Sequence, residues 1–123
     1  VLELARMLAG AIKDSEEVAA YKTAKNALKE HSAAEIMYED FQKKQLALQK
    51  KQLAGEQIQE SDINELQKLF DIIKLNPYVG EVLLAEGKLL QMIFEVQGII
   101  NEAIEDLFPN MKKPDAKINP PQQ

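Results

Sequence analysis

The chain has 123 residues, of which 46% are apolar, enough to build one small domain around a single hydrophobic core. It contains no cysteine, which excludes a disulfide framework, a thiolate metal site and a cysteine nucleophile, and which fits a cytoplasmic protein. Twenty acidic residues against 15 basic ones argue against a protein that coats nucleic acid. The apolar stretches are only a few residues long, far below the roughly 20 that span a bilayer, so we expect no membrane span.

Apolar residues recur every three or four positions along almost the whole chain, which predicts an all-α protein. A first helix is expected at residues 2–12. Glu3 and Arg6 interrupt this apolar segment, so it lacks the pattern of a signal peptide. Asp14 and Ser15 offer an N-cap for a second helix at residues 15–30. The apolar faces predicted for these two helices consist of Leu4, Met7, Leu8, Ile12, Val18, Tyr21, Ala24 and Leu28.

A third helix is predicted at residues 33–54. Ser32 followed by Glu35 has the spacing of a capping box, and Gly55 is suited to the left-handed conformation that ends a helix. The first half of this helix has enough apolar residues for a core face. That face consists of Ile36, Met37 and Phe41.

The second half of the third helix is only thinly apolar. The sequence Lys-Lys-Gln-Leu-Ala occurs at residues 43–47 and again, one heptad later, at residues 50–54. One leucine per heptad is too narrow a stripe for a buried core. We therefore predict an exposed partner-binding tip, formed by Lys43, Leu46, Lys50 and Leu53.

The lysines of this segment leave three interpretations open: an acidic protein partner, an RNA contact, or a solvated helix end. The lysines in question are Lys43, Lys44, Lys50 and Lys51. No arginine and no aromatic residue lies among them, although single-stranded nucleic acid is usually bound through stacking aromatic side chains and arginines. The sequence therefore argues against nucleic acid as the main partner.

Two further helices complete the predicted fold. Ser61 or Asp62 is expected to cap the fourth helix, which is lined by apolar residues up to Ile73, and Asn76 with Pro77 separates it from the fifth. The fifth helix extends to Phe108 and would be about 48 Å long at roughly 1.5 Å per residue. A compact domain of this size is only about 35 Å across.

The predicted architecture is therefore an elongated antiparallel helical bundle with a long helical hairpin and a long C-terminal helix. One helical domain is expected at residues 1–109. Residues 110–123 carry three prolines and almost no apolar residue, which predicts a disordered C-terminal tail.

The fifth helix has more apolar surface than one neighbouring helix can cover. One seam, expected to pack inside the chain, consists of Val82, Ala85, Leu89, Ile93, Val96, Ile100, Ala103 and Leu107. We predict that a second, adjacent side is the self-association face of a homodimer, formed by Leu83, Gly87, Leu90, Phe94, Gly98, Ile104 and Phe108. Glycine inside a helix costs about 1 kcal/mol relative to alanine, which close approach of a second backbone would explain. The alternative to a homodimer is that the chain's own helices cover both apolar sides of the fifth helix as one wide stripe.

The chain offers few residues for catalysis. His31 is its single histidine, and it falls at a predicted helix junction where a capping or solvated role is expected. One histidine cannot supply the two Glu-x-x-His pairs of a helical di-metal site. The glycines form no phosphate-binding loop. We therefore predict a protein that is not an enzyme and that has no catalytic residue, metal or cofactor.

Several short segments follow one another in an order that resembles the YlbF/YmcA family of small bacterial helical proteins, and in particular its YheA-like branch. They are Asp-Ser-Glu-Glu at 14–17 with Tyr21 and Ala24, Phe41-Gln42, the segment at 49–58, Asn76 before Val79, and Ala85-Glu86. The resemblance covers residues 2–108.

This resemblance implies an elongated helical protein that associates with itself. It also implies a cytoplasmic regulator of competence, biofilm formation or sporulation, acting through protein contacts such as those of a ribonuclease-associated complex. Some relatives carry cysteines associated with iron-sulfur clusters, but this chain has none, so that cofactor is not carried over.

Overall fold

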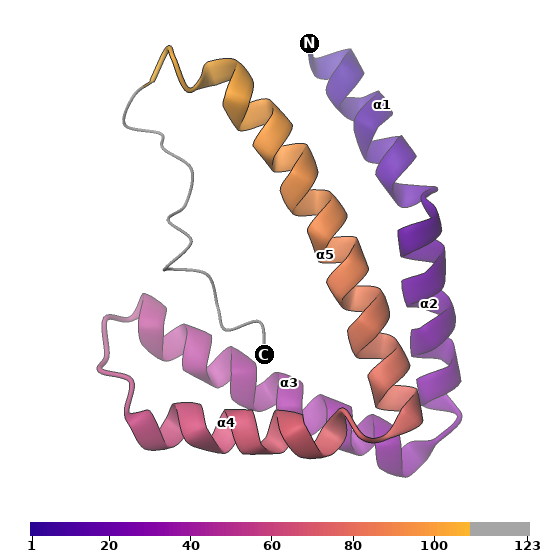
Figure 1. Cartoon of the computed structure of the whole chain (residues 1–123), viewed down its shortest axis with the longest axis vertical. Coiled ribbons are helices and arrows are strands. Elements are labelled where there is room, and N and C mark those ends of the chain that lie inside the picture. Colours follow the sequence, from indigo (N-terminus) through magenta and orange to yellow (C-terminus); the bar gives the residue numbers. More distant parts are fainter. Residues whose placement is uncertain (109–123) are drawn as a thin grey trace.

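The computed structural model of the chain describes residues 1–108, which form five α-helices and no strand (Figure 1). The all-α prediction is therefore confirmed. The helices are α1 (Leu2–Lys13), α2 (Glu16–Lys29), α3 (Ser32–Leu53), α4 (Glu60–Ile73) and α5 (Pro77–Ile104). The tail predicted at residues 110–123 lies outside the described residues.

The helices form two antiparallel pairs that meet at one corner of the molecule (Figure 1). The α2 and α5 helices lie side by side, and α3 and α4 form the predicted long hairpin, which projects to one side of the first pair. The α1 helix precedes α2 and extends past the N-terminal end of α2, where it diverges from α5. The fold is thus elongated, with two arms joined at a corner.

Side chains cap two helices: α2 at a predicted position, and α5 at Asn76, which was predicted only to separate α4 from α5. The Ser15 Oγ accepts a hydrogen bond from the Val18 amide at 3.2 Å, which caps α2. The Asn76 side chain accepts from the amides of Tyr78 and Val79 at 2.9 and 3.2 Å, with Pro77 as the first residue of α5.

Gly55 ends α3 as predicted, with a φ of 76°. Its amide donates to the Gln52 carbonyl, and the Glu56 amide donates to the Lys51 carbonyl. These two bonds form a Schellman motif, in which a residue in the left-handed region reverses the chain after a helix. The glycine therefore sets the turn from which α4 returns along α3.

Three predicted helix ends are wrong. Ser32 is the first residue of α3, whose N-cap is His31 without a capping side chain, because the first helical bond runs from the Glu35 amide to the His31 carbonyl. The α4 helix is capped by Gln59, so that Ser61 and Asp62 both lie in its first turn. The α5 helix ends at Ile104, four residues before the predicted end.

The fully buried side chains all lie at the corner where the two pairs meet. They are Ala24, Leu28, Ala34, Tyr38, Phe41, Ile73, Val79, Val82 and Ala85. Each arm contributes only the part of its helices nearest the corner. Away from it, each helix has a single neighbour or none, so its apolar residues remain in contact with solvent.

Candidate interaction surfaces

The structure leaves most of the predicted self-association face accessible. Leu90, Phe94 and Phe108 are exposed, and Phe94 retains 62% of its accessible surface. Ile104 is half-buried. Leu83 differs from the others because it packs against the chain's own core. Apart from Leu83, the predicted self-association face therefore forms an accessible apolar side of α5.

The two glycines of this face have no explanation within the chain. A Cβ atom placed on Gly87 or Gly98 would meet nothing within 4 Å. Neither glycine is thus required by a close neighbour among residues 1–108, although each lowers the helix propensity of α5. The space beside both of them is open to another molecule.

The seam of α5 that was expected to pack inside the chain is covered only near the corner. Val82 and Ala85 are buried, but Ile100 and Leu107 keep 51% and 71% of their surface exposed. The physical reason is the divergence of α1, which leaves the far half of α5 without a neighbour (Figure 1). We refer to α1 and residues 90–108 together as the α1/α5 end.

The α1 helix adds the apolar face that the sequence predicts for it to the exposed surface. None of its residues is buried, and Leu4 and Met7 are 68% and 63% exposed. A helix of 12 residues is marginally stable in water without packing contacts. The 3.6-residue period correctly indicated the apolar side of α1, but it could not indicate whether this chain or another would cover that side.

The partner-binding tip lies on the side of α3 that faces away from α4 and the core. Leu46 and Leu53 are 51% and 89% exposed. Lys44 and Lys51 form ion pairs at 3.5 Å with Asp40 and Asp62, respectively. Lys43 and Lys50 take part in none of the ion pairs found among residues 1–108. The tip thus offers two leucines and two unneutralised lysines to a partner.

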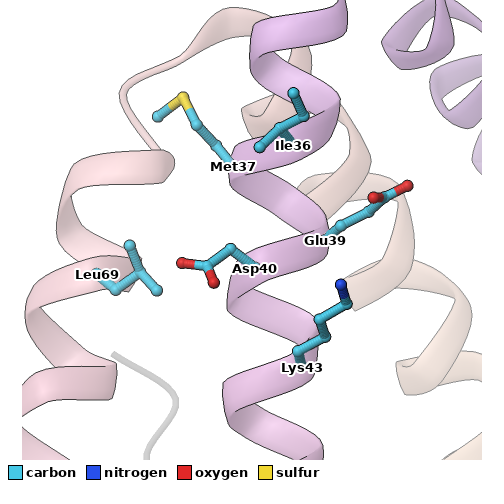
Figure 2. Close-up of a pocket in the computed structure, with 6 residues that line it drawn as sticks. All are labelled: Ile36, Met37, Glu39, Asp40, Lys43 and Leu69. Atoms are coloured by element: carbon cyan, nitrogen blue, oxygen red, sulfur yellow. The ribbon is translucent and has the colours of Figure 1, made fainter.

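An open hollow of about 320 Å³ lies beside the first half of α3 (Figure 2). Apolar side chains of α3 and α4 border it, and charged side chains stand at its rim. The lining residues are Ile36, Met37, Glu39, Asp40, Lys43 and Leu69. Its size suits one or two side chains of another molecule better than a drug-sized ligand, which buries most of its surface in a closed pocket.

In residues 1–108, no group of three or more histidine, aspartate or glutamate side chains is placed to hold a metal ion. His31 stacks on Tyr78, with ring centroids 3.5 Å apart, and so contributes to the junction between α3 and α5.

No helix in this part of the chain is long and apolar enough to cross a bilayer.

Comparison with known proteins places the chain among bacterial proteins without an assigned activity. Residues 1–105 match the family described as "Control of competence regulator ComK, YlbF/YmcA". A "UPF0342 protein" of Caldicellulosiruptor bescii is 40% identical over 105 residues, covering 85% of this chain and 88% of the relative. The "UPF0342 protein YheA" of Bacillus subtilis is 28% identical over 110 residues, covering 89% and 94%.

A solved structure has the same fold. It is a "Protein of Unknown Function (DUF964)" from Bacillus stearothermophilus, with a TM-score of 0.77 and 28% sequence identity. The match covers 89% of this chain and 96% of that one. None of these descriptions names an enzymatic activity.

Proposed function

Since the chain belongs to the YlbF/YmcA family, which is described by its control of a competence regulator, we propose that it is a non-catalytic regulatory adaptor that works as a homodimer. Its α1/α5 end would form the dimer, and its partner-binding tip would contact another protein. A regulator of this kind requires surfaces that bind other chains and no reactive group. The proposal includes a cytoplasmic location.

The observation that carries this proposal is the apolar surface of the α1/α5 end. Six large apolar side chains there are at least 60% exposed: Leu2, Leu4, Met7, Phe94, Ile99 and Leu107. Exposed apolar patches of this extent are rare on monomeric proteins and mark interaction sites. Burying one such side chain contributes about 1.5–3 kcal/mol, so a second copy that covers several of them supports a stable dimer.

The chemistry of the partner-binding tip favours an acidic protein. Lys43 and Lys50 are not neutralised within residues 1–108, and they alternate with two exposed leucines. An amphipathic segment with leucines and carboxylates would complement this side of α3. A component of a ribonuclease-associated regulatory complex is one candidate for such a partner.

A comparison of two aspartate variants tests the proposed dimer. Phe94→Asp places a charge in the apolar side of α5, and we expect it to raise the dimer dissociation constant about 100-fold, equivalent to roughly 2.7 kcal/mol. Leu53→Asp, at the far end of the other arm, should leave the dimer intact. Analytical ultracentrifugation of both variants and the parent chain at micromolar concentration measures the difference.

Both positions are exposed in the single chain, so neither substitution disturbs the core. Circular dichroism is the control for folding. A parent chain that sediments as a monomer at these concentrations would contradict the proposal. So would an equal loss of dimer in the two variants.

A further inference from the structure

The side of α3 that faces away from the core carries a heptad seam. Its six residues alternate in steps of three and four positions: Ile36, Glu39, Lys43, Leu46, Lys50 and Leu53. All six are exposed, and among residues 1–108 none of its three charged members takes part in an ion pair. This spacing is that of the a and d positions of a coiled coil, yet all six side chains stay exposed among the five helices of residues 1–108.

When the order of residues along this seam is reversed, two of the three kinds of pair that it makes with itself are complementary, and the third sets a leucine beside a lysine. If a second α3 lies antiparallel with its Leu53 opposite Ile36, then its Lys50 lies opposite Glu39 and its Leu46 opposite Lys43. Antiparallel helices pair a with d positions, as this arrangement requires. Each pair occurs twice because the contact has twofold symmetry. Apolar residues meet at both ends, and opposite charges meet next to them.

The hollow beside α3 supplies the shape that this arrangement needs. Ile36, Met37 and Leu69 are its apolar lining residues (Figure 2). In the antiparallel pairing, Leu53 of a second copy lies opposite Ile36 and therefore beside the hollow. Leu53 is 89% exposed on its own chain and projects from the end of the arm. The charged side chains that line the hollow are Glu39, Asp40 and Lys43, and Asp40 is paired with Lys44, so Glu39 is the carboxylate that Lys50 of the second copy would meet.

We propose that this seam binds the same seam of a second copy, antiparallel, with Leu53 of each chain seated in the hollow of the other. This inference rests on the proposed function only in that it takes the α1/α5 dimer as the unit being joined. The contact itself uses no residue of α1 or α5. Two different twofold contacts on one chain join dimers into tetramers or longer assemblies.

The contact also gives the partner-binding tip a means of regulation. Lys43, Leu46, Lys50 and Leu53 belong both to the tip and to the seam. A regulatory partner that binds the tip therefore has to displace the second copy. Assembly of dimers and binding of the partner exclude one another.

Engineered cysteines test the geometry directly, because the chain has none of its own. A mixture of full-length Ile36→Cys and Leu53→Cys chains should form a covalent pair under mild oxidation. The two positions are about 26 Å apart within one α3, at roughly 1.5 Å per residue, too far to join inside a chain. Gln52→Cys in place of Leu53→Cys is the matched control, since residue 52 is exposed and lies about 100° around the helix.

Three outcomes of this experiment would overturn the proposal. The first is a yield no higher than that of the Gln52→Cys control. The second is cross-linking of Leu53→Cys with itself. The third is preferential cross-linking of Ile36→Cys to Leu46→Cys, which would show an overlap shorter by one heptad that leaves Leu53 outside the hollow.

Charge reversal tests the pairing independently. In the Glu39→Lys variant, residues 39 and 50 of the two copies are both lysines and repel one another. In the Lys50→Glu variant, both are glutamates. Each variant alone should therefore fail to join dimers. A mixture of the two restores both ion pairs, so we expect it to assemble at a concentration about tenfold lower or less, with a smaller advantage at high salt. A mixture that assembles no better than either variant alone would overturn the proposal. That result is expected if the seam binds only an unrelated acidic protein.

These experiments separate the two proposals. Phe94→Asp should abolish the α1/α5 dimer and leave the cross-link between residues 36 and 53 at high protein concentration. If the cross-link forms while Phe94→Asp has no effect on assembly, the α1/α5 dimer is wrong and the seam contact stands. If Phe94→Asp dissociates the dimer and no cross-link forms, the seam contact is wrong and the dimer stands.

Discussion

Tyr38 is the residue that ties the two arms together by polar contacts. Its hydroxyl donates to Glu86 Oε2 of α5 at 2.9 Å and accepts from Gln42 Nε2 at 3.0 Å, while its ring is almost fully buried at the corner. Burial, and next the hydrogen bond to Glu86, raise the pKa of the Tyr38 hydroxyl above its ordinary value. The hydroxyl therefore keeps its proton and remains a donor at neutral pH.

Removing this hydroxyl should weaken the corner. We expect Tyr38→Phe to lower the free energy of unfolding by about 1–2 kcal/mol at pH 7, because it leaves the half-buried Glu86 carboxylate without its donor. Urea unfolding measures the change. Tyr78→Phe is the control, because in residues 1–108 the Tyr78 hydroxyl takes part in no hydrogen bond. A similar loss in both variants would contradict this role of Tyr38.

The raised pKa also predicts how this contribution depends on pH. The folded chain holds the Tyr38 proton more tightly than the unfolded chain, in which the pKa is about 10. The stabilising contribution is therefore complete below pH 10 and is lost as the pH rises further, by up to about 1.4 kcal/mol per pH unit. The difference in stability between the parent chain and Tyr38→Phe should narrow above pH 10 and stay constant from pH 7 to 9.

Gly55 determines the hairpin through its backbone conformation. At a φ of 76°, an alanine would be strained, so Gly55→Ala should destabilise the chain by about 1–2 kcal/mol, although its Cβ would meet no neighbour. Gly55→Asn should lose less, since asparagine tolerates the left-handed region. Thermal unfolding of the two variants decides between them. Equal stability of both would show that the turn does not depend on this conformation.

At the level of helices, the sequence correctly predicted the positions and ends that depend on the apolar period or on a capping or turn-forming residue. The apolar period located all five helices, and Ser15, Gly55 and Asn76 end or begin helices as expected. The starts of α3 and α4 were wrong because their N-cap residues, His31 and Gln59, make no capping hydrogen bond through their side chains, so a search for capping side chains does not find them.

The candidate surfaces were predictable to a similar extent. The self-association face of α5 and the partner-binding tip followed from helical spacing, and the structure leaves most of both exposed. The exposed side of α1 was missed, as was the far half of the α5 seam. Both depend on the direction that α1 takes from the start of α2 relative to α5, which the apolar pattern within either helix does not determine.

For the molecule as a whole, the proposed dimer should appear in its unfolding. We expect the apparent stability to rise by up to about 2.7 kcal/mol per dimer over a hundredfold increase in protein concentration, because folding and association are coupled. Met7→Asp places a charge on the exposed side of α1 and should remove this dependence. Calorimetry across the concentration range measures both chains, and identical curves at every concentration for the parent chain would contradict a dimer.

The confinement of the buried side chains to one corner also separates folding from recognition. The residues that fold the chain lie between positions 24 and 41 and between 73 and 85, whereas those that would meet other molecules lie toward the ends of the arms. Substitutions near those ends can alter binding at little expense in stability. Natural variation can thus redirect each arm to new associates while the scaffold that holds both arms persists.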